Sequence, residues 1–140
     1  MTENKGGVSE VYSPPRVVPF ARASGLTGGW SLDISSEGPD GWAWDFDLDE
    51  NRRKAEKLLD ETQSVLLIGS VMGTMFSVMK TLVRPQMGED NFQKELKEAR
   101  RHLDFVVSLY ERQAAVGRYF LHEHPAQASS WQEDCVLKLL

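Results

Sequence analysis

The sequence predicts a single α/β domain of the Rossmann-like kind, with a mostly parallel sheet flanked by helices. Short apolar segments of strand length alternate along the chain with longer segments of helical periodicity. No tight hairpin turn joins two strand-like segments, so each connection has to cross over the sheet, as in right-handed βαβ units. The 140 residues are enough for one core and too few for two.

Four segments predict strands, and residues that interrupt a strand follow them. They are residues 8–12, 30–34, 65–68 and 119–123. The first ends before Pro14 and Pro15, which lack backbone donors, and the last ends before Pro125. The third, VLLI, is continuously apolar and precedes Gly69, which is typical of a strand buried on both faces. Residues 35–41, SSEGPDG, predict a loop.

Three segments in the first 83 residues predict helices. They cover about residues 17–23, 50–62 and 74–83. We expect the first to close at Gly25 and the second to be capped by Asp47 or Asp49. We expect the third to stop before Pro85, whose ring disfavours a helical conformation in the residue before it.

A long helix near the carboxyl terminus is the clearest predicted element. Apolar side chains recur there at steps of four and three: Phe92, Leu96, Ala99, Leu103, Val106 and Tyr110. Asp90 or Asn91 is expected to cap its start and Gly117 to end it. Ser130 and Glu133 have the spacing of a capping box for one last helix.

Composition and charge narrow the possible functions. The formal net charge of −5 works against a general affinity for phosphate backbones. The basic clusters at residues 52–54 and 100–101 are interleaved with acids, so the sequence has no strong signal for nucleic-acid binding. No apolar stretch is long enough to cross a bilayer and the N-terminus lacks the apolar core of a signal peptide. We therefore expect no membrane association and a cytoplasmic or nuclear location.

The residues that follow each predicted strand are the candidates for a site, because ligands of open parallel sheets bind beyond the carboxyl ends of the strands. From residue 10 to residue 125 these segments resemble the catalytic core of DNA methyltransferases that modify carbon five of cytosine. The resemblance implies S-adenosylmethionine as the cofactor.

The segment Glu10 to Ser13, EVYS, is similar to that family's opening strand, and the resemblance makes Glu10 and Ser13 cofactor-binding residues. The family continues with glycines where this chain has Pro14, Pro15 and Arg16. Proline supplies neither the open φ range nor the N–H donors that let a backbone approach the cofactor.

Two acidic residues extend the resemblance. Asp33 lies at the end of the second predicted strand, where an acid holds ribose hydroxyls in many nucleotide-binding sheets, or it begins a turn. Asp45 is similar to the family's next cofactor-contacting acid, with a cap or turn as the alternative. Trp30, Trp42 and Trp44 flank these acids and either line an adenine pocket or pack in the core.

The segment from residue 68 to residue 77, IGSVMGTMFS, carries the most specific match. The family's catalytic loop has a similar strand, a glycine, a small residue, Pro-Pro-Cys and, after a short gap, Phe-Ser. Gly69 matches the glycine and is implied to bind cofactor, whereas residues 71–73, VMG, fill the Pro-Pro-Cys positions. The cysteine thiolate is the family's nucleophile. The resemblance thus implies that Gly73 stands at a lost nucleophile position.

The segment FLHEHP, residues 120–125, resembles the family's strand that ends in Glu-Asn. Glu123 falls at the glutamate that hydrogen-bonds the flipped base and supplies a proton, although a solvent-facing strand end is the plain alternative. His122 and His124 would share one face of the strand. A metal site needs at least one further ligand, and His102 lies beside the stripe of the long helix, so no metal is predicted.

Three hypotheses follow for the function. The first is a catalytically defective S-adenosylmethionine-dependent DNA cytosine methyltransferase-like domain that retains the binding of a nucleotide, of the cofactor or of a protein. The second is an active enzyme of another chemistry that uses Asp33, Asp45 or Glu123. The third is a structural or interaction module, a fragment of a mobile-element polyprotein, since the chain is also similar to uncharacterised segments of retrotransposon polyproteins.

The expected domain organisation is simple. Residues 1–7 predict a flexible N-terminus and residues 8–140 a single methyltransferase-like domain. The enzymes that the chain resembles continue into a target-recognition region, which we do not expect here. The sequence leaves the protein partner and the oligomeric state open.

Overall fold

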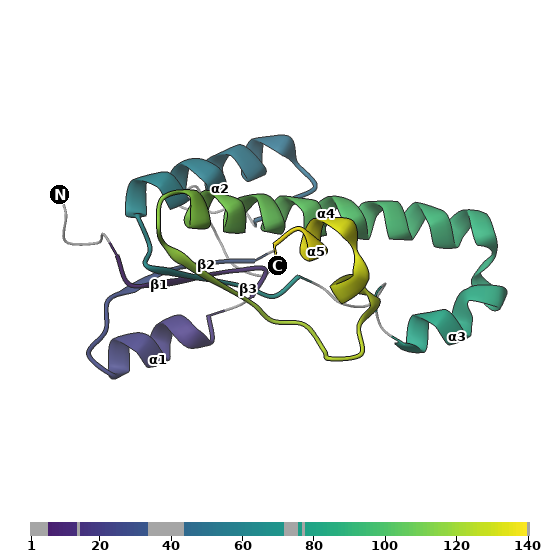
Figure 1. Ribbon diagram of the computed structural model, residues 1–140, viewed down its shortest axis with the longest axis horizontal. Helices are drawn as coiled ribbons and strands as arrows, with labels where there is room; N and C mark the ends of the chain where they lie inside the picture. The colour runs from purple at the N-terminus through teal and green to yellow at the C-terminus, as the bar shows by residue number, and fades with distance from the viewer. Residues whose placement is uncertain (1–5, 14, 34–43, 72–75, 77, 140) are drawn as a thin grey trace.

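The computed structural model describes residues 6–13, 15–33, 44–71, 76 and 78–139. Four strands form one sheet in the order β2-β1-β3-β4, and every pairing is parallel (Figure 1). The strands are β1 (Val8–Val11), β2 (Gly28–Leu32), β3 (Leu66–Gly69) and β4 (Tyr119–His122). The predicted Rossmann-like α/β fold with a parallel sheet is therefore confirmed.

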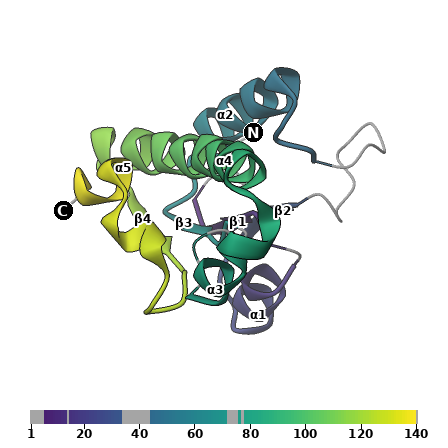
Figure 2. The ribbon, with the colours of Figure 1, turned by 90° about the vertical axis from the view of Figure 1, so that its right-hand side faces the viewer.

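Helices cover the two faces of the sheet unequally. They are α1 (Val17–Ala23), α2 (Asp49–Thr62), α3 (Val78–Met87), α4 (Glu89–Ala115) and α5 (Asp134–Leu137), with a short 3-10 helix, η2 (Ser129–Gln132). α1 packs on β1 and β2 from one side, whereas α2 and α4 lie on the other side (Figures 1 and 2). α4 extends past the carboxyl end of the sheet, where α3 packs against it.

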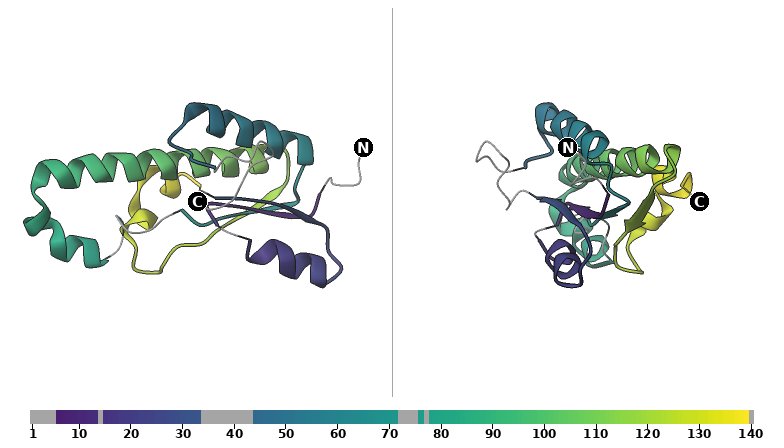
Figure 3. Two further views of the ribbon diagram at one scale, coloured as in Figure 1. Left: turned by 180° about the vertical axis from the view of Figure 1, so that it is seen from behind. Right: turned by 90° about the vertical axis from the view of Figure 1, so that its left-hand side faces the viewer.

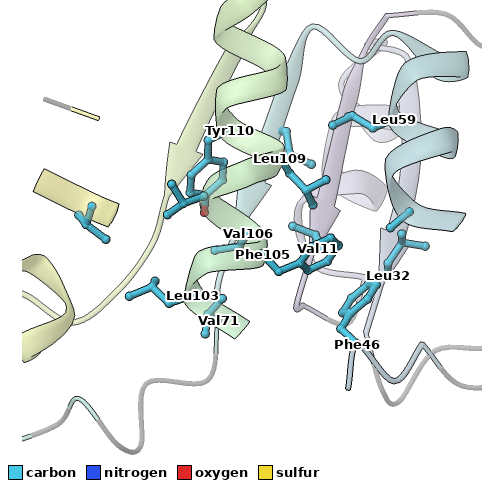
Figure 4. Close-up of a cluster of buried hydrophobic side chains, with 14 of the residues drawn as sticks. Val11, Leu32, Phe46, Leu59, Val71, Leu103, Phe105, Val106, Leu109 and Tyr110 are labelled. Carbon is cyan, nitrogen blue, oxygen red and sulfur yellow. The ribbon is translucent and has the colours of Figure 1, made fainter. Parts of the chain in front are cut away.

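The main hydrophobic core lies between the sheet and the two helices α2 and α4 (Figure 4). The predicted apolar stripe of α4 is buried at Leu103, Val106 and Tyr110, and it meets Leu67 of β3 and Leu59 of α2 in this core. Full burial of one such side chain stabilises a fold by about 1.5–3 kcal/mol. The stripe therefore anchors α4 to the sheet.

Gly69 allows α4 to approach β3 closely. A Cβ atom added to Gly69 would lie 1.9 Å from the Tyr110 hydroxyl and 2.8 Å from a methyl of Val106. The Tyr110 ring stacks on Phe120 of β4, with 4.7 Å between the ring centroids. The last residue of β3 thus has to be glycine for reasons of packing.

The residues predicted to cap the starts of α2 and α4 do not cap them. The residue before α2 is Leu48, and neither Leu48 nor Gly88, the residue before α4, makes a side-chain capping bond. Asp49 and Asp90 instead lie within the first turns, where a carboxylate is still favoured by the helix dipole. The prediction that Gly117 follows the end of α4 agrees with its φ of 76°.

The predicted end of α3 and the predicted cap at the start of the last helix were also wrong. α3 continues through Pro85 to Met87, so Pro85 lies in the last turn of the helix, where its missing N–H removes one i→i−4 hydrogen bond. Its predicted start at residue 74 lies outside the described residues. The capping box does not form, because Ser130 bonds to His124 and the Glu133 carboxylate accepts a bond from Arg100 Nε at 3.0 Å.

Gly69→Ala should destabilise the protein by about 2–3 kcal/mol, because the new methyl group overlaps the Tyr110 hydroxyl. Urea unfolding of Gly69→Ala, Tyr110→Phe and the double variant measures this. Since Tyr110→Phe removes the closest contact, the cost of Gly69→Ala should fall by at least about 1 kcal/mol in that background. Additive costs would contradict this account of Gly69.

Candidate functional site

The carboxyl ends of the four strands lie along one edge of the sheet, as the sequence predicted. The chain leaves β1 for β2 on one side and returns to β3 on the other, so the switch point of the topology lies between β1 and β3. Ser13, Asp33, Ser70 and Glu123 follow the four strands at this edge. Residues 34 and 73 lie outside the described residues, so the predicted nucleophile position of Gly73 has no described contacts.

Glu10 is a buried carboxylate at the end of β1, with 1% of its surface exposed. Its Oε1 accepts hydrogen bonds from the backbone N–H of Arg16 at 2.7 Å and from the Ser31 hydroxyl at 2.7 Å. Its Oε2 accepts a bond from the backbone N–H of Val17 at 3.0 Å. Glu10 therefore satisfies two of the free N–H groups at the start of α1 and places a negative charge at the positive end of the helix dipole.

A second set of contacts joins three segments that are distant in sequence. The Tyr12 hydroxyl lies 2.8 Å from His102 Nδ1, and His102 Nε2 lies 2.8 Å from Asp47 Oδ1. Arg101 also donates a hydrogen bond to Asp47. Burial, and then the charge of Asp47, raise the pKa of Tyr12 far above its usual range. Tyr12 therefore keeps its proton, and the two ring nitrogens of His102 link its hydroxyl to the Asp47 carboxylate.

Sequence reasoning missed this chain of hydrogen bonds. Tyr12 and His102 are 90 positions apart, and no spacing rule connects them. Tyr12 has a φ of 59°, an unusual conformation for a residue other than glycine. Such strain persists only where the surroundings over-determine it. The contacts of the ring and hydroxyl with α4 supply that constraint.

Aromatic side chains fill the space beside the end of β1. The Tyr12 ring lies 4.9 Å from Phe46 and 6.5 Å from Phe105, measured between centroids. Trp44 packs against Phe46 and is buried, and the Trp30 indole N–H donates to the Thr62 hydroxyl at 3.0 Å. Trp44 thus packs in the core and Trp30, partly buried, packs against it, whereas Trp42 lies outside the described residues.

The acids predicted to contact cofactor have different surroundings. Asp45 Oδ1 accepts a hydrogen bond from the backbone N–H of Asp47 at 2.9 Å, and the Asp45 carbonyl accepts one from Asn51 Nδ2 at 2.9 Å. These bonds form a turn that leads into α2. Asp33 is half-buried directly after β2, and Ser13 is buried after β1.

Ser70 and Glu123 meet at the ends of β3 and β4. The Ser70 hydroxyl donates to Glu123 Oε2 at 2.7 Å, and the backbone N–H of Glu123 donates to the Gly69 carbonyl at 2.9 Å. The Glu123 side chain is exposed. The pair can accept and donate hydrogen bonds at the sheet edge.

His122 and His124 point away from the Ser70–Glu123 pair. His124 Nε2 donates to the Val71 carbonyl at 2.8 Å, and its Nδ1 bonds to Ser130. His122 Nδ1 lies 2.7 Å from the Tyr110 hydroxyl, and its buried Nε2 has no hydrogen-bond partner among the described residues. Burial, and then His124, lower the pKa of His122 to about 4. The described residues contain no group of three side chains that could hold a metal ion.

Comparisons with known proteins identify no relative. The chain matches no protein-family model, no curated protein and no solved structure. None of the helices in the described parts of the chain has both the length and the apolar character needed to cross a bilayer. The site is therefore interpreted from its own geometry.

Glu10→Gln should destabilise the protein by about 2–3 kcal/mol, because an amide NH₂ would face the backbone donors that the carboxylate now accepts from. Urea unfolding at neutral pH measures the loss. The matched control is Glu98→Gln, an exposed glutamate of α4, which should cost less than about 0.5 kcal/mol. Equal costs for the two variants would contradict the capping role of Glu10.

The stability of the protein should fall as the pH drops from about 6.5 to about 4, partly because of His122. Its pKa is lower in the folded than in the unfolded state, so the unfolded chain binds the proton more readily throughout this window. His122→Asn, whose amide can still bond to Tyr110, should lose less stability between pH 7 and pH 5 in urea unfolding. Identical pH profiles would contradict the assignment.

Proposed function

We propose that this chain is a catalytically inactive, methyltransferase-like Rossmann domain that serves as an interaction module. The observation that carries the proposal is the Glu10 carboxylate at the start of α1. In nucleotide-binding sheets the amides that begin the helix after β1 bind the anionic part of the ligand. Here the amides of Arg16 and Val17 already bind a carboxylate of the chain itself.

A ligand at this position would have to displace a buried charge. Glu10 accepts three hydrogen bonds, and each hydrogen bond to a charged group contributes about 1.5–3 kcal/mol. Glu10 is the residue that the sequence resemblance assigned to cofactor binding. Its contacts support a structural role, in which the acid takes the place of an external anion.

The surroundings of β1 favour the same conclusion. Tyr12, Phe46 and Phe105 pack against one another beside the end of the strand, at the carboxyl edge where ligands of parallel sheets bind. The resemblance also places Gly73 where a cysteine nucleophile would be needed. A protein with both features keeps the Rossmann-like fold but has lost the means to bind the cofactor and to attack cytosine.

The alternative function is retained binding of S-adenosylmethionine. Asp33 and the exposed Glu123 favour it, because both follow strands at the edge where ligands of parallel sheets bind. This alternative predicts that the protein binds S-adenosylmethionine, whereas our proposal predicts that it does not.

Thermal unfolding with S-adenosylmethionine and with S-adenosylhomocysteine separates the two functions. Ligand at about a hundred times its dissociation constant would add roughly 2.7 kcal/mol, which corresponds to roughly 8 °C for a domain of this size. We expect no shift in Tm with either compound. A shift that Asp33→Asn abolishes would overturn the proposal and support the alternative.

Gly73→Cys provides a second arm of this experiment. Restoring the thiol should not yield a covalent adduct with DNA that carries a mechanism-based cytosine analogue in the presence of S-adenosylmethionine, because the cofactor does not bind. Gly73→Ser is the matched control. An adduct formed by the cysteine variant alone would contradict the proposed loss of function.

A further inference from the structure

Half of one sheet face lacks a covering helix in the described part of the chain. Phe120 and His122 of β4 contact Tyr110 of α4, so Tyr119 and Leu121 point to the opposite face, where they are 68% and 50% exposed. α1 packs on β1 and β2 of that face, and α3 lies beyond the carboxyl end of the sheet (Figures 1 and 3). Parallel sheets are normally covered on both faces.

The side chains on this face of β3 and β4 are apolar. Leu66 pairs in register with Tyr119, and Ile68 pairs with Leu121, so the four side chains share one face, Leu66 and Ile68 half-buried and Tyr119 and Leu121 exposed. We call the surface formed by Leu66, Ile68, Tyr119 and Leu121 the open face. Its width, two strands, suits one helix packed beside α1.

α1 itself has an apolar surface without a described cover. Val18 and Ala21 face the sheet, and Arg22 reaches toward β2, where it donates to the Gly29 carbonyl at 3.0 Å. At 100° per residue, Val17 and Phe20 lie on the flank opposite Arg22, toward β3 and β4. They are 38% and 76% exposed. A helix that is apolar on nearly all sides is normally buried.

Charges at the carboxyl end of the sheet indicate which helix fits the open face. Glu10 and Glu123 make similar contacts: Glu10 accepts from Ser31 of β2, and Glu123, directly after β4, accepts from Ser70, directly after β3. Glu10 shares a face with Ile68 and Leu121 and lies at the start of α1. Glu123 follows Leu121 by two residues, so it lies on that same face, exposed, where the next helix would start. An exposed cation of the covering element at this end of the sheet would complement the charge of Glu123.

We propose that a second copy of this chain covers the open face, with α1 of each copy packed against β3 and β4 of the other. A twofold axis parallel to the strands brings the two α1 helices side by side between two sheets. Each α1 then runs antiparallel to the strands of both sheets, and Phe20 enters the open face. Arg16, exposed at the start of α1, lies at the same end as Glu123 of the other copy.

The dimer satisfies requirements that neither surface meets alone. Within the described residues, each chain has a sheet face without a covering helix and a helix with an uncovered side. A twofold axis packs the helix of each copy on the sheet face of the other. The buried surface is apolar, with the charged pair at its rim. This inference rests on the proposed function, because it names the partner of the interaction module.

Sedimentation equilibrium of the full chain tests the dimer. We expect a dimer at about 100 μM protein, a concentration at which a dissociation constant in the micromolar range is readily detected. Phe20→Glu should give a monomer with an unchanged circular dichroism spectrum. Leu48→Glu, at an exposed leucine before α2, is the matched control and should leave the dimer intact. A monomeric wild type, or a dimer that survives Phe20→Glu, would overturn the proposal.

A charge exchange tests the arrangement of the two copies. Arg16→Glu and Glu123→Arg should each weaken dimerisation about tenfold by placing like charges together. The double variant should return the dissociation constant to within about threefold of the wild type. A double variant that is weaker than both single variants would overturn the twofold arrangement.

The outcomes separate this inference from the proposed function. A wild-type monomer that shows no Tm shift with S-adenosylmethionine would leave the inactive domain standing and reject the second copy as its partner. A dimer that does show the shift would reject the inactive domain and keep the dimer.

Discussion

The buried Glu10 carboxylate is the interaction on which the arrangement of the sheet edge depends. It joins β1 to Ser31 of β2 and to the first amides of α1, so one side chain sets where the first crossover helix starts. A charge of this kind is stable in a protein interior only when hydrogen bonds surround it. The same bonds occupy the amides of Arg16 and Val17, and this occupation is the basis of the proposed loss of ligand binding.

The parallel sheet imposes a second constraint, because each of its faces needs a cover. α2 and α4 cover one face completely enough to bury Leu67 and Val11, whereas α1 covers only β1 and β2 of the other (Figure 2). The chain is therefore built as if another element were present beside α1. An interaction module of this design would complete its own fold by binding a partner.

Hydrophobic periodicity and apolar runs predicted most helices and strands, because these patterns depend on residues that are close in sequence. The stripe that includes Leu103, Val106 and Tyr110 placed α4, and the run VLLI placed β3 with an error of one residue. Two of the predicted caps did not form because their side chains bond elsewhere: Asp47 bonds to His102 and Arg101 of α4, and Glu133 pairs with Arg100. Long-range ion pairs had taken the side chains that local rules assigned to caps.

The sequence by itself determined the fold class and the alignment of strand ends, since periodicity and the lack of hairpin turns depend only on neighbouring residues. Only the tertiary structure decided what Glu10, Gly69 and Tyr12 contact. Their partners lie on other segments: the start of α1, Tyr110 of α4 and His102 of α4. Whether a carboxylate binds a ligand or the start of a helix depends on which donors lie near it in the folded chain. These donors come from segments distant in sequence, so no local pattern determines how close they lie to the carboxylate.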